Sequence, residues 1–207
     1  MTAAQLITKF ELYLDDTTEL STQEELDLLN KVYRFWNSSH TWEGTKAEFS
    51  GTTSTSTPSV DLPADFLYLT ANNNNTDSSY EAGRPVVFRG ANYSACPVVS
   101  WSDRRQYRNN NGYAYIDFPN RKLTFTATPR LVEAVEFDYH AQKPDLALAD
   151  TPWFPVEYQD ALFHFMASDD FIIQQSPKAK SYKQENTIAA LDILNNAKYW
   201  NSQLVMI

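Results

Sequence analysis

The 207-residue chain has few of the residues on which most catalytic and metal sites depend. It contains one cysteine, Cys96, with three histidines and five glycines. A single thiol excludes an intrachain disulfide, and with so few thiol and imidazole groups a thiolate-rich zinc centre is excluded too. The glycines form neither GxGxxG nor GxxxxGK, so the common phosphate-binding loops are absent from the sequence.

Long apolar runs are also missing. No uninterrupted apolar stretch approaches the ~20 residues of a membrane-spanning helix, and residues 1–5 lack the basic region and apolar run of a secretory signal. We therefore expect a soluble protein made in a cytoplasm. Apolar residues make up 43% of the chain, enough for a sizeable core, and the 14% of aromatic residues suits β-packing and interfaces.

The first forty residues predict a pair of helices. Residues 2–15 carry apolar side chains on one stripe, and a second helix runs from Ser21 to about Asn37. Ser21 and Glu24 have the spacing of a capping box, in which each side chain satisfies a free backbone N–H of the other residue. The second helix is apolar over much of its girth, so we expect it to contact the C-terminal helices as well as its own partner.

The C-terminal residues predict a helical hairpin. Residues 155–175 and 177–201 both show apolar residues near a 3.6-residue period, and the break falls at a proline, which starts a helix but cannot continue one. In the second segment the apolar positions are Ile188, Leu191 and Leu194, with Ala190 and Ala197 alongside.

β-Structure is expected between the helical pairs. Residues 112–127 contain two alternating runs around a turn, which predicts a hairpin, and the alternating run 131–140 is expected to pair with it. A short helix is expected over 101–108. Further strands are expected at 42–49, 85–89 and 97–101.

These elements predict an α+β fold in which a four-helix unit carries an inserted, mainly antiparallel β-module. The predicted bounds are 1–41 for the N-terminal helical pair, 42–141 for the β-module and 142–207 for the C-terminal hairpin and tail. Residues 1–41 and 142–207 are expected to form one helical domain.

Charge is distributed unevenly along the chain. The formal net charge is −9 overall, but residues 84–130 carry +6, between −9 in residues 1–83 and −6 in residues 131–207. Such a basic middle has three interpretations: a solvated surface, a contact with the acidic ends of a neighbouring copy, or a polyanion site. The candidate residues are Arg84, Arg89, Arg104, Arg105, Arg108 and Arg121.

Three groups of side chains have the residue types of a chemical site. They are the helical set Glu157, Asp160 and His164, the strand pair Asp138 and His140, and the lone Cys96. Acids beside one histidine most often lie on a wet face, and a nucleophilic cysteine needs a base and an oxyanion site that the sequence does not indicate. We therefore predict no catalytic residue, no cofactor and no metal site, and we do not expect an enzyme.

The last residues are unusually apolar for a chain end. This segment either packs back onto its own helix or docks into a partner. The residues concerned are Tyr199, Trp200, Leu204, Val205, Met206 and Ile207.

Four short motifs, in this order, resemble the head–tail connector (adaptor or head-completion) proteins of tailed bacteriophages. They are the run LLNKVY at 28–33, Trp42-Glu43, LPADF at 62–66 and DTPWFP at 150–155. The resemblance extends over nearly the whole chain, and the segments 50–59 and 72–75 depart from the shortest members.

The resemblance implies a structural virion protein at the head–tail interface, made in the host cytoplasm. It implies a ring, commonly of twelve copies, that lies below the portal, extends the DNA channel and docks the tail or its stopper, with the C-terminal segment reaching the portal. DNA would pass without sequence-specific binding, and no membrane is involved. The alternative from the residues alone is a β-rich adhesion or carbohydrate-binding module of a phage tail, with Tyr107, Tyr113 and Tyr115 stacking on sugars.

Overall fold

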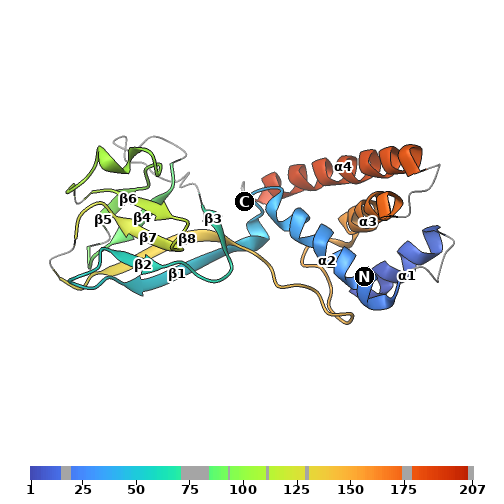
Figure 1. Ribbon diagram of the computed structural model, residues 1–207, viewed down its shortest axis with the longest axis horizontal. Coiled ribbons are helices and arrows are strands. Elements are labelled where there is room, and N and C mark those ends of the chain that lie inside the picture. The colour runs from blue at the N-terminus through green and yellow to red at the C-terminus, as the bar shows by residue number, and fades with distance from the viewer. Residues whose placement is uncertain are drawn as a thin grey trace. The chain divides into compact units, whose positions relative to one another are not determined.

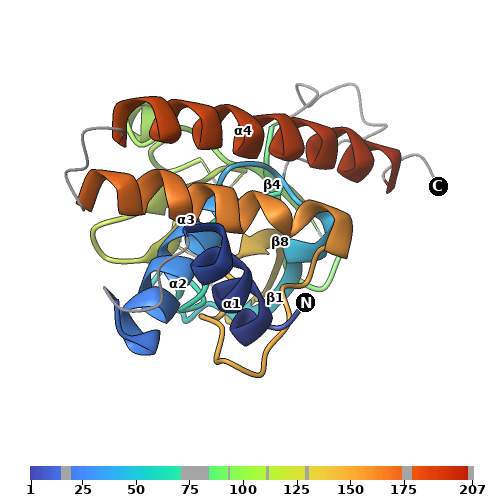
Figure 2. The ribbon, with the colours of Figure 1, turned by 90° about the vertical axis from the view of Figure 1, so that its right-hand side faces the viewer.

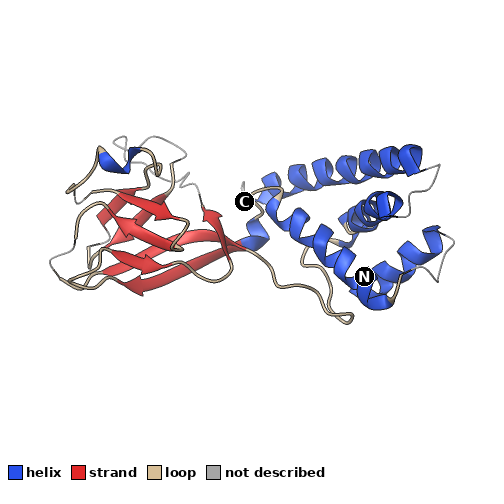
Figure 3. Cartoon of the chain, viewed as in Figure 1, coloured by secondary structure: helices blue, strands red, loops and turns tan. Residues whose placement is uncertain are grey.

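The chain folds into two compact units. The computed structural model describes residues 1–14, 20–70, 84–92, 94–110, 112–128, 131–173 and 179–204. The helical unit comprises Met1–Thr45 and Gln142–Ile207, and the β-unit comprises Lys46–Ala141. In the described residues the four α-helices lie in the first unit and the strands in the second (Figure 3). The predicted α+β class with an inserted β-module is confirmed.

Four helices form the helical unit: α1 (Ala3–Leu14), α2 (Thr22–Ser38), α3 (Asp160–Ile173) and α4 (Ala179–Leu204). Helix α3 contacts each of the other three and lies between α4 and the N-terminal pair (Figure 2). The core therefore combines residues from both ends of the chain, among them Leu6, Leu29, Leu162 and Leu194. The expected contact between α2 and the C-terminal helices is confirmed.

The N-termini of α1 and α2 are both capped by reciprocal side-chain hydrogen bonds. The predicted capping box is present: the Ser21 N–H donates to Glu24 Oε2 at 2.8 Å, and the Glu24 N–H donates to Ser21 Oγ. The hydrogen bond to Ser21 lowers the pKa of the Glu24 carboxyl. At the start of α1 the Thr2 N–H donates to Gln5 Oε1 at 2.8 Å, and the Gln5 N–H donates to Thr2 Oγ1 at 3.3 Å. The Ala3 N–H also donates to the Asp150 carbonyl at 2.8 Å, so a distant segment helps to hold the start of this helix.

An aromatic stack joins α2 to the segment that precedes α3. The Trp36 ring stacks on Trp42 at 5.1 Å and on Phe154 at 4.4 Å, and all three side chains are buried. Trp42 Nε1 donates to the Trp36 carbonyl at 2.8 Å, and Trp153 Nε1 donates to Asn37 Oδ1 at 2.8 Å. Through its ring, Trp36 thus joins two of the motifs that carried the resemblance, Trp42-Glu43 and the segment 150–155.

Two predictions about the C-terminal helices are wrong in detail. The first helix begins at Asp160 rather than at 155, because Val156–Tyr158 forms a separate 3₁₀ turn, η3. In α4 the predicted residues Ala190, Leu194 and Ala197 are buried, whereas Ile188 and Leu191, predicted for the same face, are 52% and 41% exposed. Small side chains let α4 approach α3 closely, so burial there does not follow side-chain size. The predicted break at Pro177 lies outside the described residues.

The β-unit contains two antiparallel sheets (Figure 1). The larger sheet has the order β1-β8-β4-β5, with β3 also pairing with β8, and the smaller has the order β2-β7-β6. The strands of the larger sheet are β1 (Lys46–Thr52), β3 (Phe66–Leu69), β4 (Val86–Arg89), β5 (Ser94–Pro97) and β8 (Ala134–Ala141). Those of the smaller sheet are β2 (Ser59–Asp61), β6 (Ala114–Asp117) and β7 (Lys122–Phe125).

The two sheets enclose a shared core. Val135 and Phe137 of β8 pack in the same buried cluster as Leu123 and Phe125 of β7. Since successive side chains of a strand point to opposite faces, the remaining residues of these strands point away from the core on each side.

The predicted hairpin at 112–127 is confirmed as β6 and β7, but the predicted partner of residues 131–140 is wrong. Strand β8 pairs along its length with β1, from Lys46 opposite His140 to Thr52 opposite Ala134, and its other edge is shared by β4 and β3. Alternation indicates which face of a strand is buried and gives no information about its neighbour, so the sequence could not assign this long strand to the larger sheet.

Other strand boundaries shift for local reasons. Glu43–Thr45 forms a 3₁₀ turn, η1, so β1 begins at Lys46 rather than at 42 and continues to Thr52, into the Ser/Thr-rich segment. The short helix predicted over 101–108 is reduced to the 3₁₀ turn η2 (Asp103–Arg105). The segment 72–75 lies outside the described residues.

Candidate functional site

The six candidate arginines separate into residues engaged within the β-unit and residues at its surface. Arg89 Nε lies 2.9 Å from Glu133 Oε2, its side chain is 11% exposed, and its guanidinium lies over the Phe125 ring. Arg121 donates from Nη2 to the Pro63 carbonyl at 2.9 Å and to the next carbonyl, of Ala64, at 3.1 Å. Arg89 and Arg121 therefore stabilise the unit itself.

Arg121 adopts φ 50°, a left-handed conformation in the turn between β6 and β7. This conformation directs its side chain to the segment 62–66, whose carbonyls it binds, and the Arg121 carbonyl in turn accepts from the Leu62 N–H at 2.9 Å. The LPADF motif is thus held by the predicted hairpin turn. Arg84 is exposed just before β4 and has an interaction partner of its own.

The remaining arginines, Arg104, Arg105 and Arg108, lie in one turn between β5 and β6. Ser100 Oγ donates to Asp103 Oδ2 at 2.7 Å and starts this turn. The Asn109 N–H donates to the Thr126 carbonyl at 2.9 Å and fixes its end against β7. Three guanidinium groups are therefore held together by a turn that is anchored at both ends.

These arginines line a hollow that we call the arginine pocket. It has a volume of about 410 Å³, and its wall also includes Thr124 and Tyr115. The Arg104 guanidinium lies 3.6 Å from the centre of the Trp101 ring and donates to the Trp101 carbonyl.

Among the described residues that line the arginine pocket there is no carboxylate. Within the described part of the chain, the guanidinium groups of Arg105 and Arg108 form no ion pair or hydrogen bond, and both side chains are exposed. Clustered guanidinium groups with unused donors form a site for an anion, because each presents a planar fork that matches a carboxylate or phosphate.

A second hollow, with a volume of about 430 Å³, lies on the larger sheet and is acidic. Glu48, Glu136 and Asp138 line it beside Ser50 and Phe88. Glu48 lies directly opposite Asp138 in the pairing of β1 with β8. We call this surface the carboxylate patch. The sequence alone did not indicate this patch, although its acids occupy the outward-facing positions of two alternating strands.

The start of the C-terminal segment is held to the helical unit by Asn201. The buried Asn201 side chain accepts from the Glu43 N–H at 2.8 Å and donates to the Thr41 carbonyl at 3.0 Å. Trp200 contacts the ring of Tyr158, while Tyr199 is 71% exposed. Leu204 ends α4. Val205, Met206 and Ile207 lie outside the described residues.

The other chemical candidates do not assemble a site. Asp160 binds Lys9 at 2.6 Å, whereas His164 Nδ1 lies 2.8 Å from Asn186 Oδ1, so the predicted helical set has separate partners. His140 is buried against the Tyr68 ring and Asp138 is exposed. Burial raises the pKa of the Cys96 thiol, which disfavours the reactive thiolate. Among the residues that the structure describes, no group of three potential metal ligands is found.

A search of the described helices finds none that is both long and apolar enough to span a membrane. A family model described as SU10 adaptor protein matches residues 1–206. No curated protein matches the chain.

Proposed function

The chain belongs to the SU10 adaptor protein family, a family of phage head–tail adaptors, and from this premise we propose that it forms a ring of twelve copies below the portal. The family is one of structural proteins, so the chain has a structural role in the virion neck rather than an enzymatic one. In the proposed ring it extends the DNA channel and gives the tail or its stopper a docking surface.

The observation that carries this proposal is the extent of the family match. It covers residues 1–206 and therefore both the helical unit and the β-unit. A carbohydrate-binding module, the alternative considered above, would require only the β-unit and gives no reason for a four-helix unit built from both chain ends.

The distribution of charge supports a DNA channel. The helical unit contains sixteen acidic and eight basic residues, whereas the β-unit contains ten and nine, so nearly all of the net charge of −9 belongs to the helical unit. An acidic lumen repels phosphate and lets DNA slide without sticking. We propose that the helical unit faces the channel. A ring whose lumen is basic would contradict this assignment.

The Asn201 contacts support a role for the C-terminus in portal binding. Because Asn201 is bound to the backbone at residues 41 and 43, we expect the helical unit to fold without the residues after Leu204. The apolar residues 204–207 are then available to insert into a groove of the portal, next to the exposed Tyr199.

The decisive experiment measures the mass of the chain alone and mixed with its portal, and images the mixture by electron microscopy. We expect a ring on the portal. A chain that never binds the portal would overturn the proposed function. Deleting residues 204–207 is expected to weaken portal binding and leave the thermal unfolding of the free chain unchanged, and loss of folding would show instead that the tail packs on its own helices.

A further inference from the structure

The arginine pocket and the carboxylate patch lie on opposite faces of the β-unit. Phe137 of β8 and Phe125 of β7 point into the shared core. Their neighbours Asp138 and Thr124 therefore point outward on opposite sides of the two-layer unit. Thr124 lines the arginine pocket and Asp138 lines the carboxylate patch.

From this arrangement we propose that the arginine pocket binds the carboxylate patch of a second copy of this chain. Arg105 and Arg108 supply the guanidinium forks, and Glu136 and Asp138 supply the carboxylates. The inference rests on the proposed ring and identifies the two flanks that close it.

The two surfaces carry opposite charges, and the charged groups named here have no ion-pair partner among the described residues. In the described residues, the carboxylates of Glu48, Glu136 and Asp138 form no ion pair or hydrogen bond, and Glu48 directly faces Asp138. Like charges opposite each other on a sheet destabilise it, and a cationic partner removes that repulsion. The described wall of the arginine pocket has three arginines and no carboxylate, so it supplies such a partner.

Opposite placement determines the kind of assembly. A contact that joins different surfaces on opposite faces of each copy is heterologous, and repeating it produces a closed ring or an open filament rather than a symmetric dimer. The arrangement therefore suits an annular adaptor better than a two-fold pair.

Duplex DNA is a poorer partner for the arginine pocket. Non-specific binding to a duplex depends on many phosphate contacts along an extended surface. Here three arginines lie in one hollow of about 410 Å³ on a chain of net charge −9. A small cluster of protein carboxylates matches the limited extent of the pocket better than an extended row of phosphates does.

The test compares full-length variants by sedimentation velocity over a series of protein and salt concentrations. We expect the wild type to self-associate at low salt. The variants R105Q/R108Q and E136Q/D138N should each weaken this association by about tenfold or more. The control K183Q/K198Q removes two positive charges from the helical unit and should associate as the wild type does.

Mixing the two neutralised variants gives the sharper result. Each keeps one intact surface, so the mixture should form a one-to-one complex that grows no further. A third variant with both surfaces reversed, R105E/R108E/E136R/D138R, should regain self-association.

Three results would overturn the inference. They are a wild type that stays monomeric at every concentration, R105Q/R108Q associating as the wild type does, and a short DNA duplex whose binding to the wild type is lost in R105Q/R108Q. None of these removes the proposed function, because a ring imaged on the portal would stand regardless. Absence of any portal complex would remove the proposed function itself.

Discussion

The helical unit and the β-unit use their polar side chains for opposite purposes. In the helical unit buried amides connect segments that are far apart in sequence: Asn30 binds the backbone of Leu146, and Asn201 binds the backbone at Thr41 and Glu43. In the β-unit backbone ladders connect most segments, with Arg89 and Arg121 as exceptions, and the charged side chains of the arginine pocket and the carboxylate patch lie on the two outer faces. The first unit is thus fixed internally by individual side chains, and the second offers surfaces.

This difference affects what each unit tolerates. A buried amide that satisfies backbone groups has no substitute, since its loss leaves donors and acceptors without partners. An exposed residue on a sheet face can change with little effect on folding, so binding surfaces can be altered there at low risk. Mutations should therefore divide by unit into those that affect stability and those that affect assembly.

The largest effect is expected for Trp36→Ala, which tests whether the aromatic stack holds the helical unit. The side chain is fully buried between Trp42 and Phe154, and its removal should cost about 3–5 kcal/mol. Urea unfolding followed by far-UV circular dichroism measures this loss. Trp101→Ala, at a 43% exposed site of the β-unit, is the control. Equal losses of unfolding free energy in the two variants would contradict the proposed difference between the units.

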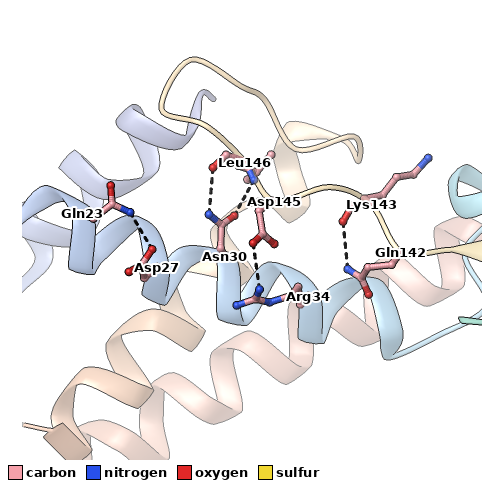
Figure 4. Close-up of polar contacts among 8 residues, drawn as sticks. All are labelled: Gln23, Asp27, Asn30, Arg34, Gln142, Lys143, Asp145 and Leu146. Atoms are coloured by element: carbon pink, nitrogen blue, oxygen red, sulfur yellow. Dashed lines mark hydrogen bonds and ion pairs between the residues drawn. The ribbon is translucent and has the colours of Figure 1, made fainter. Parts of the chain in front are cut away.

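The next effect is expected for Asn30→Ala. Asn30 Nδ2 donates to the Leu146 carbonyl at 3.1 Å, and the Leu146 N–H donates to Asn30 Oδ1 at 2.7 Å (Figure 4). Losing both should cost about 2–4 kcal/mol, because two buried backbone groups are left unsatisfied. The exposed neighbours Gln23 and Asp27 provide the control: Gln23→Ala should change the unfolding free energy by less than about 0.5 kcal/mol.

A smaller effect is expected in the β-unit for Arg121→Ala. The two hydrogen bonds from Arg121 are exposed, so their loss should cost only about 0.5–1 kcal/mol. Thermal unfolding measures it. Arg121→Lys should recover little, because a single ammonium cannot reproduce the guanidinium fork. A loss as large as that of Asn30→Ala would show that individual side chains also fix the β-unit.

The smallest effect concerns pH and His40 in the helical unit. Burial, and secondarily the charge of Lys198, lowers the pKa of His40 below its ordinary value of 6.5. Below pH 6.5 His40 binds a proton in the unfolded chain but not in the folded chain. The contribution of His40 to stability is therefore present above pH 6.5 and is lost as the pH falls to the lowered pKa of His40.

His40→Asn should therefore flatten the pH dependence of stability just below pH 6.5, as measured by urea unfolding at a series of pH values. A mutant whose pH profile parallels that of the wild type would show that His40 contributes nothing to it.

Local signals in the sequence predicted the elements that they specify. The capping box at Ser21 and the hairpin at 112–127 depend on neighbouring residues, so single-sequence reasoning found both. It could not place β8, because alternation is identical whichever strand lies alongside. In α4 it named Ala190, Leu194 and Ala197, which are buried, but also Ile188 and Leu191, which are exposed, because the apolar pattern does not distinguish the buried edge of the helix from the exposed one.

The sequence indicated the candidate surfaces only as an uneven distribution of charge along the chain. The excess of arginine in residues 84–130 was visible, but the structure was needed to separate the internally bound Arg89 and Arg121 from the arginine pocket. The carboxylate patch combines β1 with β8, whose residues are about ninety positions apart in the chain, so no local pattern brings its members together.

The chain enters the β-unit at β1 and leaves it at β8, and these strands are hydrogen-bonded neighbours, with Lys46 opposite His140. The two chain connections of the β-unit therefore lie side by side, as in an inserted domain. Loops within the β-unit can lengthen or shorten, and strands can be added at its edges, without moving the two points at which it connects to the helical unit. One helical unit can in this way carry β-units of different size, each complementary to a different partner protein.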